Sequence, residues 1–161
     1  MDLISIVTFL PLVGAAVLLL FPRNDGVIRS FSLVLSSVVF FLSLKLLFGF
    51  EINADMQFVK QVPWIPSLGI SYNVGIDGLS LFLVLLVTLT MPISILSAFK
   101  AVTDRVKEFH ICLLILETAM IGAFVSLDLF LFYVFWEMML IPMYFLIGPS
   151  RFKDGSCSIY N

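Results

Sequence analysis

The stretch DLFLFYVFWEMMLIPMYFLIG, residues 128–148, decides the fold class of this chain. Apart from two acidic side chains it is apolar, and a helix of about 20 such residues crosses the roughly 30 Å hydrocarbon core of a membrane. We therefore predict a membrane-spanning helix at 129–148. Glu137 lies near its middle, where a charged side chain costs at least about 2.5–3.5 kcal/mol to insert and usually serves ion or proton movement. Glu137 is the first candidate functional residue.

The composition of the whole chain agrees with a membrane protein. Of its 161 residues, 61% are hydrophobic and 12% are charged, whereas soluble proteins are about 25% charged. The mean hydropathy is +1.13. Four further apolar stretches have the length of a membrane span, at 3–21, 31–50, 79–99 and 109–127. The predicted fold class is an all-α membrane protein with about five transmembrane helices.

The distribution of Lys and Arg predicts the orientation of these helices. Two of the nine basic residues, Lys45 and Lys60, lie on the side reached after the second span. Because positively charged loops stay on the inner side of a membrane, we place the N-terminus outside and the C-terminus inside. The seven basic residues that mark the inner side are Arg23, Arg29, Lys100, Arg105, Lys107, Arg151 and Lys153.

The largest segment outside the predicted spans lies between the second and third of them. It has β-type runs at 56–62 and 68–74 around a turn with two prolines, so we expect a small hairpin or an ordered loop on the outer side. Trp64 and Tyr72 suit the headgroup layer of a membrane. The chain is thereby divided into helices one and two (1–50), this segment (51–78), helices three to five (79–148) and an inner tail (149–161).

Two acidic residues are predicted at the same depth in the membrane. Asp128 is expected to be a turn residue between spans four and five. Glu117 precedes it by 11 residues and Glu137 follows it by 9. At 1.5 Å per residue both carboxylates lie roughly 14–17 Å from that turn, near the middle of the bilayer. The spacing does not decide whether the two side chains face each other.

The fifth span carries further polar groups near its acid. Tyr133, Glu137 and Tyr144 fall within about 40° of one another at 100° per residue. They form a stripe of one acid and two hydroxyls, although aromatic packing explains the tyrosines equally well. Pro142 cannot donate a hydrogen bond to the carbonyl of Met138, so we expect a kink just past Glu137 that frees backbone carbonyls near the acid.

The fourth span has two different faces. His110 and Glu117 fall within about 20° of each other and define a titratable face, although an interfacial residue at a helix start is the simpler interpretation of His110. Glu117 is a second candidate for proton transfer, or a packing residue hydrogen-bonded between helices. The opposite face carries small residues that allow close helix packing in lipid, namely Ala119, Gly122, Ala123 and Ser126.

The chain offers no charged partner for Glu137 within the membrane. An acid that moves protons needs a group whose charge or position changes, and no Lys or Arg lies mid-span. Glu117 and Glu137 together could store a proton but give it no direction. Cys112, Cys157 and the single His form no metal or disulfide pattern, and the net charge of −2 does not suggest nucleic acid. We expect no cofactor and no metal in this chain.

Two motifs resemble a known family. FWE followed by four residues and a proline, within 128–148, is similar to the fifth helix of the M subunit of bacterial NADH-quinone oxidoreductase, called chain 4 in organelles. VGIDGLSL, residues 74–81, resembles the start of the third helix in the same family. The resemblance covers roughly residues 1–148.

The resemblance implies a function that the residues alone do not state. It implies a partial antiporter-like bundle from a proton-translocating subunit in the membrane arm of respiratory complex I, where the acid matching Glu137 pairs with a lysine two helices further on. FMN and iron–sulfur clusters would be bound by partner subunits, and quinone would be the substrate of the complex. Other membrane-arm subunits and the lipid bilayer would be its partners. The membrane would be the bacterial inner membrane or an organelle inner membrane.

Two alternatives remain open from the sequence. A subunit of a multi-subunit cation/proton antiporter would share this fold and the acid. A non-catalytic membrane fragment is the third interpretation, because the helix with the partner lysine is absent from this sequence. The tail 149–161 departs from the family pattern and is expected to be a truncated or frameshifted end. By itself the chain is not expected to translocate protons, and Glu117 matches no family motif.

Overall fold

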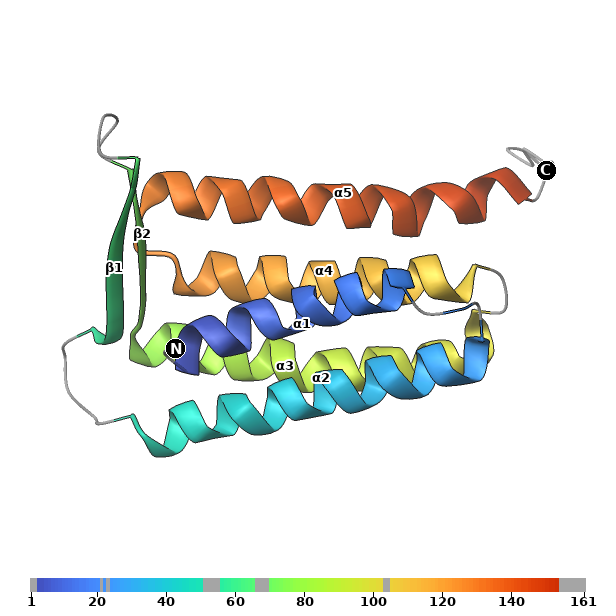
Figure 1. The fold of residues 1–161 in the computed structure, drawn as a ribbon, viewed down its shortest axis with the longest axis horizontal. Coiled ribbons are helices and arrows are strands. Elements are labelled where there is room, and N and C mark those ends of the chain that lie inside the picture. The colour runs from blue at the N-terminus through green and yellow to red at the C-terminus, as the bar shows by residue number, and fades with distance from the viewer. Residues whose placement is uncertain are drawn as a thin grey trace, which may run out of the picture.

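Five long helices lie side by side with their axes roughly parallel (Figure 1). The computed structural model describes residues 3–20, 22, 24–50, 56–65, 70–102 and 105–153, and within these ranges it does not describe the side chains of 64, 65, 70 and 148–153. All five helices are long and apolar enough to cross a membrane, which confirms the predicted fold class. The helices are α1 (Leu3–Leu20), α2 (Asp25–Phe48), α3 (Gly78–Ala101), α4 (Val106–Val125) and α5 (Leu129–Lys153).

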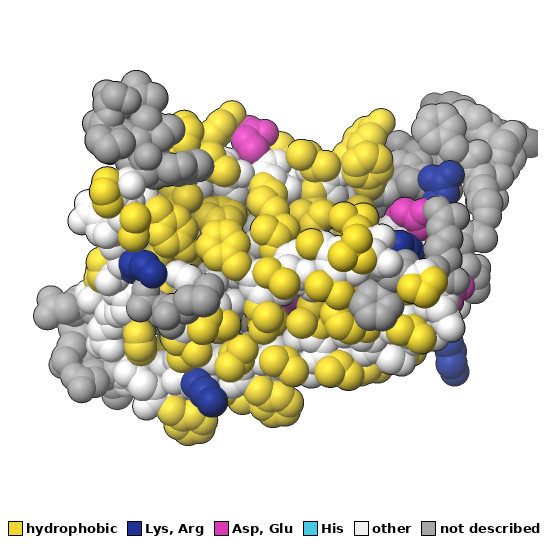
Figure 2. All heavy atoms as spheres, viewed as in Figure 1, with side chains coloured by type: hydrophobic (Ala, Val, Ile, Leu, Met, Phe, Trp, Pro, Cys, Tyr) yellow, Lys and Arg dark blue, Asp and Glu magenta, His cyan; other side chains and the backbone are white. Residues whose placement is uncertain are grey.

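The two ends of the bundle differ in their connections. A β-hairpin of β1 (Gln57–Ile65) and β2 (Ile70–Ile76) crosses one end, which we call the hairpin end (Figure 1). The α1–α2 and α3–α4 connections lie at the other end, which we call the basic end. Figure 2 shows that hydrophobic side chains cover the middle of the visible face, as expected for a surface in contact with lipid. The basic residues at the basic end include Arg29, Lys100, Arg105 and Lys107.

Helix α2 begins earlier than its apolar stretch. The prediction placed the span at 31–50, but the helix starts at Asp25, after Asn24 in an extended conformation. An acidic residue in the first turn favours a helix start, because it complements the helix dipole. Arg29 joins this polar turn to α3 by donating a hydrogen bond from Nη2 to the carbonyl of Val102 (2.8 Å). Apolar length therefore indicates where the hydrocarbon ends, and the helix continues beyond it.

Helix α4 is the centre of the bundle and packs against the other four helices. Its small residues allow α5 to approach closely, since a Cβ atom on Gly122 would collide with the ring of Phe135. Ala119 and Ala123 are buried as well. Of the predicted packing face of α4, Gly122 lies against α5.

The hairpin contacts the helices at its end of the bundle. Its strands are antiparallel, with Val62 opposite Tyr72, where the sequence analysis left a hairpin and an ordered loop open. Tyr72 lies against α1, with its hydroxyl 3.5 Å from Ser5 Oγ. The backbone N–H of Leu127 donates to the carbonyl of Asn73 (2.9 Å). The strand β2 thus holds the turn between α4 and α5. The side chain of Trp64 lies outside the described residues.

Aspartates cap two of the helices. Asp77 precedes α3 and accepts a hydrogen bond from the backbone N–H of Ser80 (2.7 Å). Asp128 precedes α5 and accepts from the backbone N–H of Phe130 (2.8 Å) and, at longer range, of Leu131 (3.4 Å). Both side chains satisfy N–H groups that a helix start leaves without partners. Asp128 therefore serves the turn, as the sequence analysis expected.

Candidate proton-transfer site

Glu137 lies on the side of α5 that points away from the other helices. The residues of α5 that are buried in the bundle are Leu131, Phe135 and Pro142, which form one stripe at helical spacing. Glu137 lies more than 90° from this stripe and is exposed. Figure 2 shows an acidic side chain among hydrophobic ones along the α5 edge of the visible face. The candidate acid is therefore not covered by the part of the chain that the structure describes.

The two tyrosines share this uncovered face with Glu137. Tyr133 is 58% exposed and Tyr144 is 74% exposed. The Tyr133 hydroxyl lies within hydrogen-bonding reach of the Glu137 carboxyl, one turn away on the same helix. The stripe of one acid and two hydroxyls is therefore formed, and it faces outward rather than into the bundle.

Pro142 is positioned on the opposite side of α5. Its side chain is buried toward the bundle, and α5 continues through it to Lys153 as one helix. The proline leaves the carbonyl of Met138 without its usual helical hydrogen bond. The kink just past Glu137 stays a prediction.

Glu117 lies at the depth of Glu137 but faces into the bundle. It is eight residues before the last residue of α4, and Glu137 is eight residues after the first residue of α5. Each is therefore about 12 Å from the turn between the two helices. Glu117 is fully buried, and neither of its carboxyl oxygens makes a hydrogen bond among the described residues. The two acids do not share a proton here, because sharing requires a hydrogen bond between them.

His110 is buried where the sequence analysis favoured an interfacial position. It lies near the basic end as expected, but α1 and α2 also pack on α4 and its side chain has no exposed surface. Its Nδ1 lies 2.7 Å from the carbonyl of Val106, and its Nε2 has no partner among the described residues. Asp25 and Arg29 of α2 are close enough to act on it electrostatically.

A line of hydroxyls on α2 was not predicted from the sequence. Ser32, Ser36 and Ser43 are fully buried on the inner face of this helix. Ser43 lies 2.8 Å from the hydroxyl of Thr88 on α3, whereas Ser36 Oγ has no partner among the described residues. The serine spacing of four and seven residues places them on one helical face, which was a signal available in the sequence.

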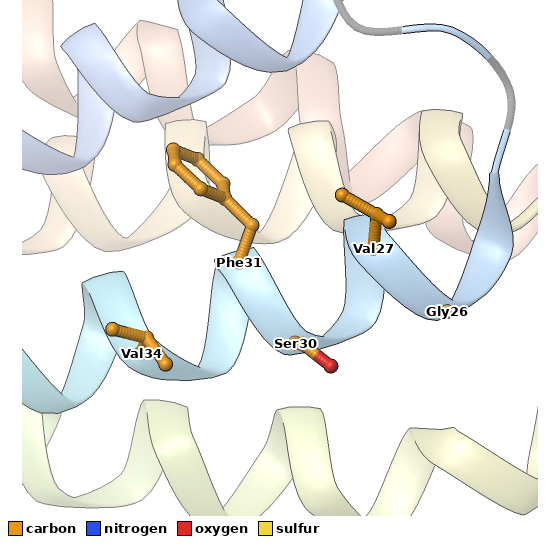
Figure 3. A pocket seen from close by; sticks show the side chains of 5 residues that line it. All are labelled: Gly26, Val27, Ser30, Phe31 and Val34. Carbon is orange, nitrogen blue, oxygen red and sulfur yellow. The ribbon is translucent and has the colours of Figure 1, made fainter.

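No other part of the described structure competes as a site. An open hollow on the outer face of α2 is lined by residues of that helix alone and carries no acid or base (Figure 3). Among the described residues no three His, Cys, Asp or Glu side chains come together as a metal site would require. Cys112 is a free thiol, and Cys157 lies outside the described residues. The residues that line the hollow are Gly26, Val27, Ser30, Phe31 and Val34.

Proteins with similar sequences are named as subunits of NADH-quinone or NADH-ubiquinone oxidoreductase. No protein-family model matches it. The chain is 47% identical over 153 residues to NADH-quinone oxidoreductase subunit M of Rhodobacter capsulatus, and 42% identical over 141 residues to NADH-ubiquinone oxidoreductase chain 4 of Marchantia polymorpha. These matches cover 91% and 86% of this chain, and 29% and 28% of the relatives. The chain thus spans less than a third of the length of these relatives.

Solved structures show the same fold. A chain of respiratory complex I from Thermus thermophilus with bound NADH matches with a TM-score of 0.74 and 30% identity, over 91% of this chain and 29% of that chain. A chain of the Mrp complex from a Dietzia species matches with a TM-score of 0.75 over 93% of this chain and 16% of that chain, but its 19% identity shows the fold alone. The chain is an integral membrane protein, and its sequence and fold place it in the family of NADH-quinone oxidoreductase subunit M, called chain 4 in NADH-ubiquinone oxidoreductase.

Proposed function

We propose that this chain is part of a membrane-arm subunit of NADH-quinone oxidoreductase and contributes to proton translocation coupled to electron transfer from NADH to quinone. Glu137 is the residue that carries the proton. The observation behind this proposal is an acid at mid-membrane depth on an uncovered face of an otherwise apolar helix.

The uncovered position of Glu137 requires a protein partner. A charged side chain at this depth is costly in lipid, and such residues face other protein or a water-filled cavity. The chain spans 29% of the length of its relative from Rhodobacter capsulatus. We therefore assign the α5 face with Glu137 as the surface that the rest of the subunit covers.

The partner at this face has to change the charge state of Glu137. A carboxylate gains its proton when a nearby positive charge leaves and loses it when that charge returns, because an opposite charge stabilises the ionised form. The family resemblance implies that a lysine from a later helix has this role. The Tyr133 hydroxyl, which can both donate and accept, extends the hydrogen-bonding path along α5.

The redox chemistry belongs to other subunits in this proposal. FMN, the iron–sulfur clusters and the nicotinamide site lie in partner subunits, and quinone is a substrate of the complex as a whole. Other membrane-arm subunits flank this one. The membrane is the bacterial inner membrane, or the inner membrane of an organelle.

Replacing the acid tests this assignment. We expect Glu137→Gln in the full-length subunit to lower proton pumping by at least about tenfold, which corresponds to roughly 1.4 kcal/mol, because the amide cannot carry the proton. Pumping is measured as dye quenching in vesicles that oxidise NADH. Assembly of the complex should be unchanged, since the Glu137 side chain is exposed on α5 and glutamine has nearly the same shape as glutamate.

The matched control is Asp128→Asn, which removes the carboxylate just before the same helix but keeps a side chain that can cap it. This variant should pump at the wild-type rate. Wild-type pumping by Glu137→Gln in an assembled complex would contradict the role assigned to the acid.

A cation/proton antiporter subunit is the second candidate, because the chain of the Mrp complex has this fold. The two functions differ in what drives the proton. Proton movement that requires NADH oxidation supports the first, and exchange of Na⁺ for protons without NADH supports the second.

A further inference from the structure

Three buried polar groups between α2 and α4 have unsatisfied atoms. Both carboxyl oxygens of Glu117, the Ser36 hydroxyl and His110 Nε2 make no hydrogen bond among the described residues, and all three side chains have no exposed surface. Such groups are rare in folded proteins, because each one costs roughly 1–3 kcal/mol or more when left without a partner. Their concentration along one helix pair requires an explanation other than packing.

The two helices bring these groups into register. Both α2 and α4 begin at the basic end and run toward the hairpin end (Figure 1). Arg29 and His110 are each four residues from their helix start, at a depth of about 6 Å. Ser36 and Glu117 are each eleven residues from it, at about 16 Å. The electrostatic effect of Arg29 on His110 and the nearness of Ser36 to Glu117 agree with this register.

The chemistry of these groups is that of a site that binds and releases a proton, rather than of a site that holds a permanent charge. No charged side chain of the described residues acts on Glu117, and Ser36 is the polar neighbour that does. An ionised carboxylate without a counter-charge is very costly in such surroundings, so the carboxyl is kept neutral by its own proton. At His110, a carbonyl only accepts, so Nδ1 carries the hydrogen and the neutral ring leaves Nε2 free to accept a proton.

We propose that Glu117 and Ser36 form a second proton-binding site, separate from Glu137, which exchanges protons with the basic end along the buried face of α2 past Ser32 and His110. The Ser32 hydroxyl donates to the carbonyl of Ile28 and can still accept, at a depth between His110 and Glu117. The step is a proton transfer without electrons. In the exchange, the O–H bond of Glu117 breaks and its proton passes to Nε2 of His110, which leaves a carboxylate and an imidazolium. The return of a proton from Nε2 forms the O–H bond again, and the carboxyl and the ring are both neutral.

This inference deepens the proposed function and takes from it that the subunit moves protons. It does not depend on the role of Glu137. Glu117 and Glu137 face away from each other across the α4–α5 contact. The experiment on one acid can therefore give a negative result without affecting the experiment on the other.

Infrared spectroscopy of the assembled complex, with the full-length subunit in vesicles, tests the site. The carbonyl stretch of a protonated carboxyl is assigned to Glu117 by its loss in Glu117→Gln, and its shift is followed after transfer from H₂O to D₂O. We expect the band to be present and to exchange. His110→Asn and Ser36→Ala should each slow the exchange by about tenfold or more. Asn keeps a donor for the carbonyl of Val106 and removes the atom that corresponds to Nε2.

Ser43→Ala is the matched control. It removes a buried hydroxyl from the same face of α2, but that hydroxyl pairs with Thr88 and lies beyond Glu117 as seen from the basic end. Exchange should keep its wild-type rate in this variant. If His110→Asn does not assemble, as judged by electron transfer from NADH to quinone, Ser36→Ala decides.

The proposal is overturned if Glu117→Gln removes no protonated-carboxyl band, if the band does not exchange, or if Ser36→Ala exchanges as fast as Ser43→Ala. The same measurement on Glu137→Gln should show wild-type exchange at Glu117. Loss of pumping there with normal exchange separates the two acids, and normal pumping there overturns the role of Glu137 without affecting this site.

Discussion

Gly122 determines how closely α4 and α5 approach. A Cβ atom at this position would collide with the ring of Phe135. Phe135 is buried, so relieving this collision requires its ring or one of the two helices to shift. The close approach of α4 and α5 at this point therefore depends on the missing Cβ of Gly122.

We expect Gly122→Ala to destabilise the bundle by about 1–3 kcal/mol, the usual cost of overpacking a well-packed site. The measurement is loss of helix during denaturant titration in detergent micelles. Gly78→Ala is the control, since a Cβ there meets nothing within 4 Å. Equal stability of the two variants would show that the α4–α5 contact is looser than described.

Asp77 gives the start of α3 a pH dependence. Its hydrogen bonds with Ser80 hold the pKa of the carboxyl below its usual value of about 3.9. A lowered folded pKa means that the ionised cap stabilises the protein above about pH 3.9, and that this contribution is lost as the pH falls through the folded pKa.

Asp77→Asn keeps an acceptor for the Ser80 N–H but has no charge to lose. We expect the variant to lose less stability than the wild type between pH 5 and the acid limit, roughly pH 2. Thermal unfolding in detergent, followed at several pH values, gives the comparison. Identical acid sensitivity in both proteins would show that Asp77 does not contribute.

The hairpin and the α4–α5 turn act together at the scale of elements. The link is one backbone hydrogen bond from Leu127 to Asn73, beside a bridge between Val74 and Ser126. Ser126 has an extended backbone, with φ −72° and ψ 125°, which is the conformation that a following proline requires.

Leu127→Pro therefore removes the N–H donor of residue 127 and is compatible with the backbone of Ser126. Leu127→Ala also removes the leucine side chain but keeps the N–H. We expect the proline variant to be less stable than the alanine variant by about 1 kcal/mol, the net value of such a hydrogen bond. Hydrogen exchange of the β2 amides should rise in the proline variant alone. No difference between the two would mean that the hairpin does not hold the turn.

Sequence patterns predicted where the helices lie better than they predicted which face of each helix is buried. Apolar length located all five helices, and Asp128 was identified at its turn. Helical spacing grouped Tyr133 with Glu137, but it could not decide that this group faces outward, because spacing defines a face and only neighbouring helices decide what covers it. Helical spacing likewise placed Glu117 on a titratable face but could not decide that this face is buried in the bundle. Ser36 was missed because a serine in a membrane helix is as readily a small packing residue as a polar one.

At the scale of the whole molecule, α5 contacts the bundle through one side only. Its other side presents Tyr144, which is 74% exposed. The photoreactive amino acid benzoylphenylalanine can replace Tyr144, because it is also a para-substituted aromatic side chain. In the assembled complex with the full-length subunit, we expect it to crosslink to protein, as identified by mass spectrometry. The isolated chain in detergent is the control and should give no such product. Capture of phospholipid alone in the complex would show that this face is bare.

The short connection between α4 and α5 also determines how the pair enters the bilayer during synthesis. Ser126, Leu127 and Asp128 alone separate the two helices. Three residues cannot leave one finished span in the membrane while the next waits outside, because they reach only about 10 Å. With this turn on the outer side, as the Lys and Arg distribution predicts, we expect the two helices to leave the translocon as one hairpin, in which the apolar length of both outweighs the roughly 2.5–3.5 kcal/mol that Glu137 costs in lipid. We therefore expect α4 to hold α5 in the bilayer before any partner reaches the acid.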